Sequence, residues 1–346
     1  MNANPILPYA QELEEVAGSG LIALINARRG GDVLSLRHVD SDCELLWQSR
    51  SARDAIPSAG PLSHIRPSFY DEYPGGIQEL FPNTAESTCV DGAELPFHGE
   101  SCRIPWRIHP RDPGNNHDLT LSAQLNRYPV LMQRTISVDG DLPILRLESK
   151  IINLSSRPLK YSWAYHPALG EALLHGSSSL YLSRQEFVAH PTEFSKAQRW
   201  APGSQVPLER AEDLWVHRFR QSREVGADLL YADGADGWFI ARNDQTGLTV
   251  TASWDAKEMP RIWVWEECHD PTGYPWWGME HVVGLELHSS APAGELASLP
   301  VGDGLRVLEG LQTRQAFLKL AVTFTSPSAT PVGVDASGLP VVEERY

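Results

Sequence analysis

Apolar and polar residues alternate along this chain in short stretches with a period of two. In the segment 21–39 (LIALINARRGGDVLSLRHV), two such stretches flank an Arg-Gly-Gly-Asp sequence. The segment 130–154 (VLMQRTISVDGDLPILRLESKIINL) repeats this pattern around Asp139-Gly140. A period of two is that of a strand, and Gly and Asp are typical turn residues, so each segment is predicted to form a β-hairpin.

The same pattern continues to the C-terminal part of the chain, whereas helical periodicity is scarce. Further predicted strands lie in 237–254, 260–267, 282–287 and 315–324. The chain also has 27 glycines and 26 prolines, which fit many turns and few helices. The predicted fold is therefore all-β, a large antiparallel sandwich or barrel.

The domain organisation predicted from this pattern is simple. No segment reads as a linker, so residues 1–346 are expected to form one domain with an ordered core over about 20–325. The segment 186–224 is the least strand-like and is expected to be an excursion with one short helix. The Pro/Ser/Gly-rich tail 326–346 is expected to pack loosely.

The charge balance limits the class of partner. The chain carries 29 basic and 44 acidic side chains and a formal net charge of −15. Such a charge disfavours nucleic acid and anionic membrane surfaces. We therefore expect a small-molecule ligand, with no nucleic-acid or membrane partner.

The sequence also bears on cellular location. It has no apolar run of the roughly 18 residues that a membrane helix needs, and its first 15 residues, MNANPILPYAQELEE, lack a basic region followed by an apolar one. A cytoplasmic protein is the expectation. The cysteines have no CxxC spacing, which favours reduced, buried thiols over a disulfide framework; they are Cys43, Cys89, Cys102 and Cys268.

Three ionisable residues stand out by their surroundings. His98 is followed by Gly99, which allows a turn or a close approach to a ligand. His166 precedes Pro167, which pushes the histidine toward an extended conformation, so His166 is predicted to end a strand at a cleft. Glu286 lies in an apolar strand, where a carboxylate is costly unless it is paired or faces a wet cavity. Each residue alone also has a structural interpretation, as a bonded histidine or a solvent-facing glutamate.

The chain resembles the aldose 1-epimerase family, also called the galactose mutarotases. The similarity extends from roughly residue 20 to 325, and its motifs occur in the family's order. The motifs are GGIQELFPN (75–83), HGE...PW (98–106), RTISVDGDLPILRLESKIINLSSRPLKYSWAYHPALG (134–170), MPRIWVWEE (259–267) and GLELHSSAP (284–292).

This resemblance implies a galactose mutarotase-like β-sandwich with a carbohydrate site on a concave face. It also implies a reaction that interconverts the α and β anomers of a free sugar, without a cofactor or a metal. By the family pattern Glu286 matches the base, His166 the acid, and His98 a second histidine near the ring oxygen. An imidazole and a carboxylate suit these roles, and such groups contribute about 10²–10⁴-fold.

Substrate contacts are less well defined by the motifs. The family uses an aspartate to hold a sugar hydroxyl, and none of Asp228, Asp233 and Asp255 lies in a matching motif, so Glu266 or Glu267 is an alternative. Aromatic faces pack against sugars, and Trp263, Trp265, Trp276 and Trp277 are close together in the sequence, although core packing accounts equally well for most of them. The predicted substrate-binding residues are Arg103, Trp106, Trp265 and Glu267.

Three other interpretations remain open. A branch of the superfamily acts on hexose 6-phosphates through arginines, and Arg66, Arg103 and Arg107 are candidates, although Arg103 is one position beyond the family's arginine. A non-catalytic carbohydrate-binding protein is the second. In each case the chain is expected to be a monomer or a homodimer. A metal-dependent isomerase is the third and has the least support; its ligands would be His98, Glu100, His109 or His117.

Overall fold

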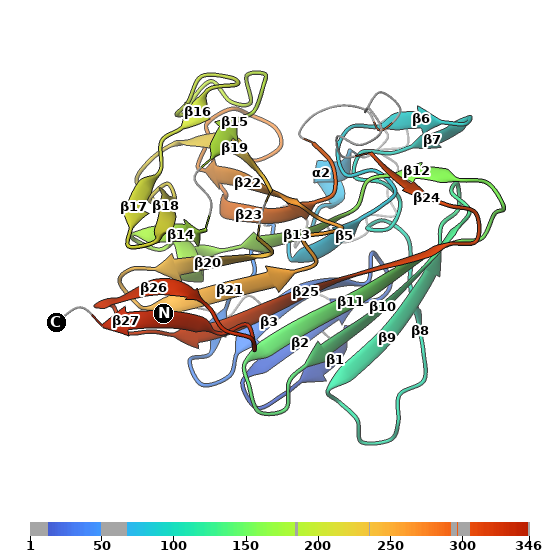
Figure 1. Cartoon of the computed structure of the whole chain (residues 1–346), viewed down its shortest axis with the longest axis horizontal. Helices are drawn as coiled ribbons and strands as arrows, with labels where there is room; N and C mark the ends of the chain where they lie inside the picture. Colours follow the sequence, from blue (N-terminus) through green and yellow to red (C-terminus); the bar gives the residue numbers. More distant parts are fainter. Residues whose placement is uncertain are drawn as a thin grey trace.

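The computed structural model describes residues 13–49, 68–183, 186–234, 236–291, 296 and 305–344. Two large antiparallel sheets dominate it and pack against each other (Figure 1). The predicted all-β sandwich is confirmed. In the described part of the chain no helix is long and apolar enough to cross a membrane.

The first sheet has eleven strands and carries the motifs of interest in its central part. In spatial order it consists of β1 (Glu14–Ala17), β2 (Leu21–Asn26), β3 (Asp32–His38), β5 (Ile77–Leu80), β13 (Ala164–Leu169), β23 (His281–His288), β22 (Arg261–Cys268), β19 (Gly226–Asp233), β15 (Phe187–Ala189) and β16 (Gln205–Val206), with β4 (Cys43–Glu44) paired to β3.

The second sheet has ten strands. In spatial order it consists of β17 (Glu209–Ala211), β18 (Leu214–Arg218), β14 (Ser178–Leu182), β20 (Trp238–Asn243), β21 (Leu248–Trp254), β25 (Thr313–Phe324), β11 (Ile144–Asn153), β10 (Val130–Val138), β9 (Asp118–Gln124) and β8 (Arg107–Ile108). Both predicted hairpins, β2–β3 and β10–β11, form with antiparallel pairing.

Three two-stranded sheets and two single-turn helices complete the described structure. They are β6 (Thr88–Val90) with β7 (Ala93–Leu95), β12 (Leu159–Tyr161) with β24 (Arg306–Leu308), β26 (Ala329–Val334) with β27 (Pro340–Glu344), α2 (Phe69–Glu72) and α3 (Glu171–Leu174).

Three sequence-based expectations need correction. The segment 186–224 contains four short strands, β15 to β18, and no helix among its residues, all of which the structure describes. The tail forms the hairpin β26–β27, which lies beside β20 (Figure 1) and packs Val334 against the cluster around Ile240.

Of the four cysteines, all free, Cys102 and Cys268 are buried, Cys43 is half-buried and Cys89 is exposed.

The core between the sheets follows from strand alternation, since every second side chain of a strand faces it. Leu285 and Leu287 of β23 pack there with Leu318 and Leu320 of β25. A buried ion pair lies within this apolar core. Arg134 Nε of β10 donates to Glu79 Oε2 of β5 at 2.6 Å, and both side chains are 0% exposed.

Glu79 is fully engaged by the groups around it. Its Oε2 also accepts from the Ser149 hydroxyl at 2.8 Å, and its Oε1 accepts from the Trp163 indole at 2.7 Å. These hydrogen bonds satisfy a buried charge that would otherwise be costly. They also tie β5 of the first sheet to β10 and β11 of the second.

Candidate functional site

The site is built on the face of the first sheet that points away from the second sheet. Because Leu285 and Leu287 face the core, alternation sends Glu286 and His288 to the opposite face. Trp263 of β22 is the register partner of Glu286 and therefore shares that face. Three adjacent central strands, β13, β23 and β22, thus place side chains next to one another on this face.

Glu286 lies between two histidines. Its Oε1 is 3.2 Å from His166 Nε2, and its Oε2 is 2.8 Å from His288 Nε2. Glu286 and His166 are each 4% exposed, and His288 is 0% exposed. The arrangement is a buried chain of three groups that can exchange protons.

The prediction that His166 ends a strand is wrong. β13 continues through Pro167 to Leu169, so His166 lies in the middle of a central strand. It pairs with Gln78 of β5 on one side, while the pairing with β23 is interrupted at His166 and Pro167. A proline cannot donate a ladder hydrogen bond, which accounts for this gap. The gap lies directly beside Glu286.

His98 reaches the same place from a turn. It has a positive φ of 62°, and the following Gly99 has a φ of 75°. A Cβ on Gly99 would lie 2.3 Å from the carbonyl oxygen of Phe81, so only glycine allows this close approach. The ring centroids of His98 and His166 are 5.8 Å apart.

The hydrogen bonds of the His98 and His166 rings determine which ring nitrogen is left to interact with other groups. His98 Nδ1 donates to the carbonyl oxygen of Thr84 at 2.7 Å. The neutral His98 ring therefore keeps a lone pair on Nε2, where it can accept a hydrogen bond. His166 Nδ1 lies 3.3 Å from the hydroxyl of Tyr73, which leaves His166 Nε2 to interact with Glu286.

Burial shifts the pKa values in this cluster in opposite directions. It raises the pKa of Glu286 to about 8 and lowers the pKa of His166 to about 4. Burial, together with the charge of His166, holds the pKa of His98 well below its usual value. The pKa of His288 is lowered in the same way. Between about pH 4 and 8, the pair of Glu286 and His166 thus carries one dissociable proton.

Aromatic side chains surround the cluster. Tyr73 and Phe69 stack with ring centroids 5.0 Å apart, and Phe69 meets His98 edge to face at 4.7 Å. Trp265 lies 6.1 Å from His166 and 5.6 Å from Trp276. Helix α2, strand β22 and the loop after β22 supply this layer, and the helix and the loop are joined where Tyr274 OH donates to Asp71 at 3.1 Å.

Beside Glu286, three buried polar atoms have no hydrogen-bond partner among the described residues. They are Tyr231 OH, Trp263 Nε1 and His288 Nδ1. The Trp263 and His288 rings stack at 3.6 Å with an interplanar angle of 5°, and Tyr231 meets Trp263 edge to face at 5.0 Å. This group offers hydrogen-bonding capacity to a polar ligand.

Sequence reasoning missed several of these residues. His288 has a local signal, because two residues of a strand spaced by two face the same side, and Glu286 and His288 have that spacing. Tyr73 and Tyr231 have no comparable signal, since they reach the cluster through α2 and through the pairing of β19 with β22.

The predicted substrate-binding residues lie in different places. Trp265 is beside His166, as described above. Arg103 has its guanidinium 5.5 Å from the ring of Phe69, next to His98. Trp106 instead lies in the main core under Arg134, with its indole N–H donating to the Ser101 carbonyl oxygen at 3.0 Å. Glu267 shares the face of Trp265 but accepts from the Asp270 backbone at 2.8 Å, toward the end of the strand.

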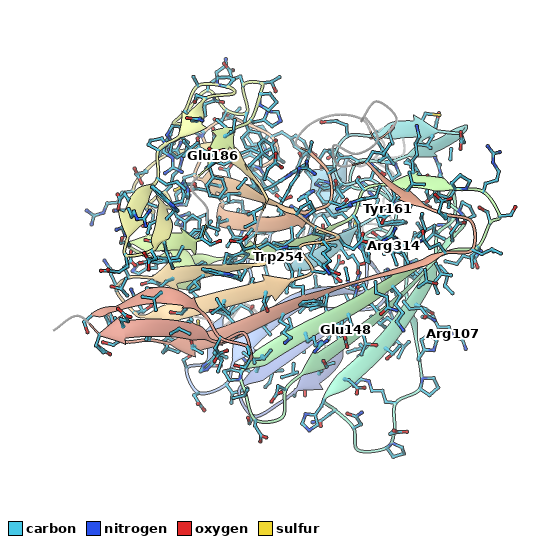
Figure 2. All side chains as sticks on the ribbon, viewed as in Figure 1. Arg107, Glu148, Tyr161, Glu186, Trp254 and Arg314 are labelled. Atoms are coloured by element: carbon cyan, nitrogen blue, oxygen red, sulfur yellow. The ribbon has the colours of Figure 1, made fainter. Side chains whose placement is uncertain are left out.

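Arg103 is one position beyond the family's arginine, and in a strand this offset would turn its side chain to the other face. Residues 100–104 instead form turns and bends, so the offset does not turn Arg103 away. Turns bring Arg103 back toward the cluster, where it lies 4.0 Å from Glu72. Arg107 is on the edge strand β8 of the second sheet, at the rim of the molecule (Figure 2). Arg66 is outside the described residues.

The candidate acidic residues are mostly engaged elsewhere. Asp228 and Glu266 bind Arg199 in a buried charge network on the core side of the sheet. Asp233 pairs with Arg261 at 2.5 Å and is 74% exposed, and Asp255 donates its backbone N–H to Phe317 on the second sheet.

Asp32 is an aspartate that the motifs did not suggest. It accepts from Gln78 Nε2 at 2.8 Å, and Gln78 is the register partner of His166. Asp32 Oδ1 is buried and has no hydrogen-bond partner among the described residues. Burial raises its pKa to about 7.

The residues named for a metal-dependent isomerase bond separate partners. Apart from His98, they lie in three different environments, in which His109 contacts Ser122, His117 donates to Ala17 and Glu100 accepts from Asn126 and Arg127.

Comparison with solved structures identifies the class of fold. Slr1438 from Synechocystis sp. PCC 6803 has a TM-score of 0.67 at 17% identity, covering 94% of this chain and 100% of that one. A galactose mutarotase-like protein from Lactobacillus casei has a TM-score of 0.63 at 16% identity, covering 90% and 100%. A galactose mutarotase related enzyme from Lactobacillus acidophilus has a TM-score of 0.64 at 15% identity, covering 90% and 98%.

The fold is therefore that of the galactose mutarotase-like β-sandwiches. Within this class, the chain belongs to the family described as a domain of unknown function, DUF4432, whose model matches residues 15–322. No curated protein matches the chain.

Proposed function

We propose that the protein is an aldose 1-epimerase that interconverts the α and β anomers of a free hexose. The observation that carries the proposal is Glu286 held between His166 and His288 on a buried, aromatic-lined face. The names of the structural relatives agree with this proposal, because two of them are described as galactose mutarotase-like or related. The residues provide one acid and one base, which is what anomer exchange requires.

The reaction begins with the single proton that Glu286 and His166 share. Its transfer from the Glu286 carboxyl to His166 Nε2, across 3.2 Å, creates a carboxylate and an imidazolium. The carboxylate removes the proton of the C1 hydroxyl while the imidazolium protonates the ring oxygen. The bond between C1 and the ring oxygen breaks and a C1 carbonyl forms. After rotation about the C1–C2 bond, the reverse steps close the ring on the other face.

The remaining groups position the sugar. His98 Nε2 accepts a hydrogen bond from a sugar hydroxyl, because its Nδ1 proton is committed to Thr84. The Trp263 indole and the Tyr231 hydroxyl donate to sugar oxygens beside Glu286, and Trp265 packs against the C–H face of the ring. Asp32 takes the role of the aspartate that holds a hydroxyl.

The test is the rate at which fresh α-glucose and α-galactose approach anomeric equilibrium, followed by NMR or polarimetry. We expect the wild type to accelerate the exchange, and His166→Ala and Glu286→Gln to lower the catalysed rate by roughly 10²–10⁴-fold. His109→Gln, just after β8 and bonded to Ser122 of the second sheet, is the control and should keep full activity. Full activity in either site variant, with the fold intact by circular dichroism, would refute the assignment.

A second candidate substrate is a hexose 6-phosphate. Arg29 and Arg103 both lie at the edge of the cluster, 3.7 and 4.0 Å from Glu72, with side chains 21% and 23% exposed. Two arginines that converge in this way suit a phosphate. A preference for the phosphosugar that is lost in Arg103→Met would favour this candidate. Sugar binding without any exchange would favour a carbohydrate-binding protein.

A further inference from the structure

A second cluster of ionisable side chains lies at the end of β22 and the start of β23. Cys268 and His281 are register partners on these strands, and His269 follows Cys268. One ligand atom from each of the three residues lies within 4.8 Å of the others. Alternation places Cys268 and His281 on the core side of the sheet, opposite to Glu286. The cluster is thus separate from the candidate active site.

The hydrogen bonds of the two histidines prepare them to act as ligands. His281 Nδ1 bonds Glu171 Oε2 at 3.1 Å, and His269 Nδ1 donates to the carbonyl oxygen of Gly278 at 3.2 Å. A neutral ring with its proton on Nδ1 carries its lone pair on Nε2. A carboxylate or carbonyl on the second ring nitrogen is also the usual outer partner of a metal-bound histidine.

The burial of His281 is an independent indication that its side chain binds a ligand. Its side chain is 5% exposed, and its Nε2 atom has no hydrogen-bond partner among the described residues. An imidazole nitrogen buried without a partner carries a desolvation cost, so it calls for an explanation. The adjacent Cys268 side chain is also buried, at 1% exposed.

The backbone holds the cluster in place. His269 has a positive φ of 50°, and its backbone N–H donates to the Glu280 carbonyl oxygen at 2.8 Å. This hydrogen bond closes the loop that connects β22 and β23. The ligand atoms therefore come from two paired strands and the first residue of a closed loop, which limits their movement.

We propose that Cys268, His269 and His281 bind a zinc ion. A thiolate with two imidazole nitrogens is a ligand set that zinc favours in a tetrahedral site, with water as the fourth ligand. On binding, the Cys268 thiol releases its proton to solvent and ends its hydrogen bond to the Glu224 carbonyl oxygen at 2.9 Å. The His281 ring also releases the second proton that its raised pKa lets it hold at neutral pH. The bound ion joins the ends of β22 and β23, the strands that also carry Trp263 and Glu286.

Cobalt is the probe for the test, because a thiolate bound to Co²⁺ gives a charge-transfer absorption band. The full-length chain is treated with a chelator, which is then removed, and is titrated with Co²⁺ and afterwards with Zn²⁺. We expect one Co²⁺ per chain, the band, and its loss when Zn²⁺ displaces the cobalt. Zn²⁺ should also raise the melting temperature in a concentration-dependent way.

Matched variants locate the metal. Cys268→Ser should abolish the band, and His281→Gln should weaken binding, whereas Cys89→Ser, which changes an exposed cysteine, should leave both unchanged. Glu171→Gln changes a side chain that is 62% exposed, so it should keep the fold while it weakens metal affinity by roughly 10- to 100-fold.

Two results would overturn the proposal. One is a folded wild-type chain that shows no band at saturating Co²⁺, and the other is a band that persists in Cys268→Ser. Neither result depends on anomer exchange, so the metal site and the proposed enzymatic function are tested separately.

Discussion

His288 Nε2 lies 2.8 Å from Glu286 Oε2, and the two residues are separated by one position on β23. The strand alone fixes this relationship, because alternate residues face the same side. Trp263 stacks on His288 and holds its ring in place. Glu286 thus meets a positioned imidazole on the carboxylate oxygen that does not face His166.

We predict that His288→Phe reduces anomer exchange while leaving the fold intact. Phenylalanine keeps the stacking on Trp263 but removes the nitrogen that stabilises the Glu286 carboxylate. A hydrogen bond to a charged group is worth about 1.5–3 kcal/mol, so kcat/KM should fall roughly 10- to 100-fold. The pKa of Glu286 should rise, which moves the upper limb of the pH profile to higher pH. An unchanged profile would mean that His288 only packs.

The wild-type pH profile is itself a prediction. The pair of Glu286 and His166 holds one proton between about pH 4 and 8, whichever of the two residues carries it. We expect kcat/KM to be flat between these values, to fall below about pH 4 as a second proton binds, and to fall above about pH 8 as the shared proton is lost. A single limb near pH 6.5 would instead indicate an isolated, solvated histidine.

Glu286 should also make stability depend on pH. Its pKa is raised from 4.5 to about 8 in the folded state, so the folded chain holds a proton that the unfolded chain releases between these values. The carboxyl's contribution to stability is complete below pH 4.5 and is lost as the pH rises through 8. The free energy of unfolding should then decrease by up to about 1.4 kcal/mol per pH unit across this range.

Urea denaturation of wild type and Glu286→Gln at pH 5 and pH 8 measures this effect. Glutamine cannot ionise, so the variant should gain stability relative to wild type as the pH rises. Comparing the two proteins at each pH cancels the titration of all other groups. A difference that stays constant with pH would argue against a raised pKa.

The buried pair of Arg134 and Glu79 provides a further prediction. Glu79→Gln leaves the guanidinium of Arg134 buried without its counter-ion, and breaking a buried pair in this way typically costs 3–5 kcal/mol. We expect a loss of that order in the free energy of unfolding, measured by denaturant titration. Glu148→Gln, at an exposed position on β11, is the control and should change little. A loss below about 1 kcal/mol would contradict the assigned role.

The sequence predicted the fold well because the signal for a hairpin is local. Strand alternation and turn residues lie within 25 residues of each other in 21–39 and 130–154, and both hairpins form. The sequence predicts a helix in 186–224, where the structure has short strands. Strands of two to five residues, such as Gln205–Val206, are too short to show alternation.

The candidate site was only partly predictable from the sequence. His98, His166 and Glu286 were found through motifs, and the structure brings them together from a turn and two adjacent strands. The position of Trp106 could not be predicted from the sequence. The sequence around a tryptophan does not show whether it packs under a buried arginine or lines a cleft. The cluster of Cys268 and His281 depends on the register of two strands, which the spacing of these residues does not encode.

Glu79 also determines which side chain of β5 stands beside His166. In the observed register Glu79 meets Arg134 in the core and Gln78 faces His166 and Asp32. A slip of one residue in either direction would place Gln78 or Leu80 opposite Arg134 and would turn the Glu79 carboxylate toward the face that carries His166 and Glu286, which leaves a charge unpaired on each side of the sheet. The ion pair between Arg134 and Glu79 therefore fixes which β5 side chain lies beside His166, although both of its residues lie on the other side of the sheet. It does so by making the shifted alignment of β5 electrostatically unfavourable.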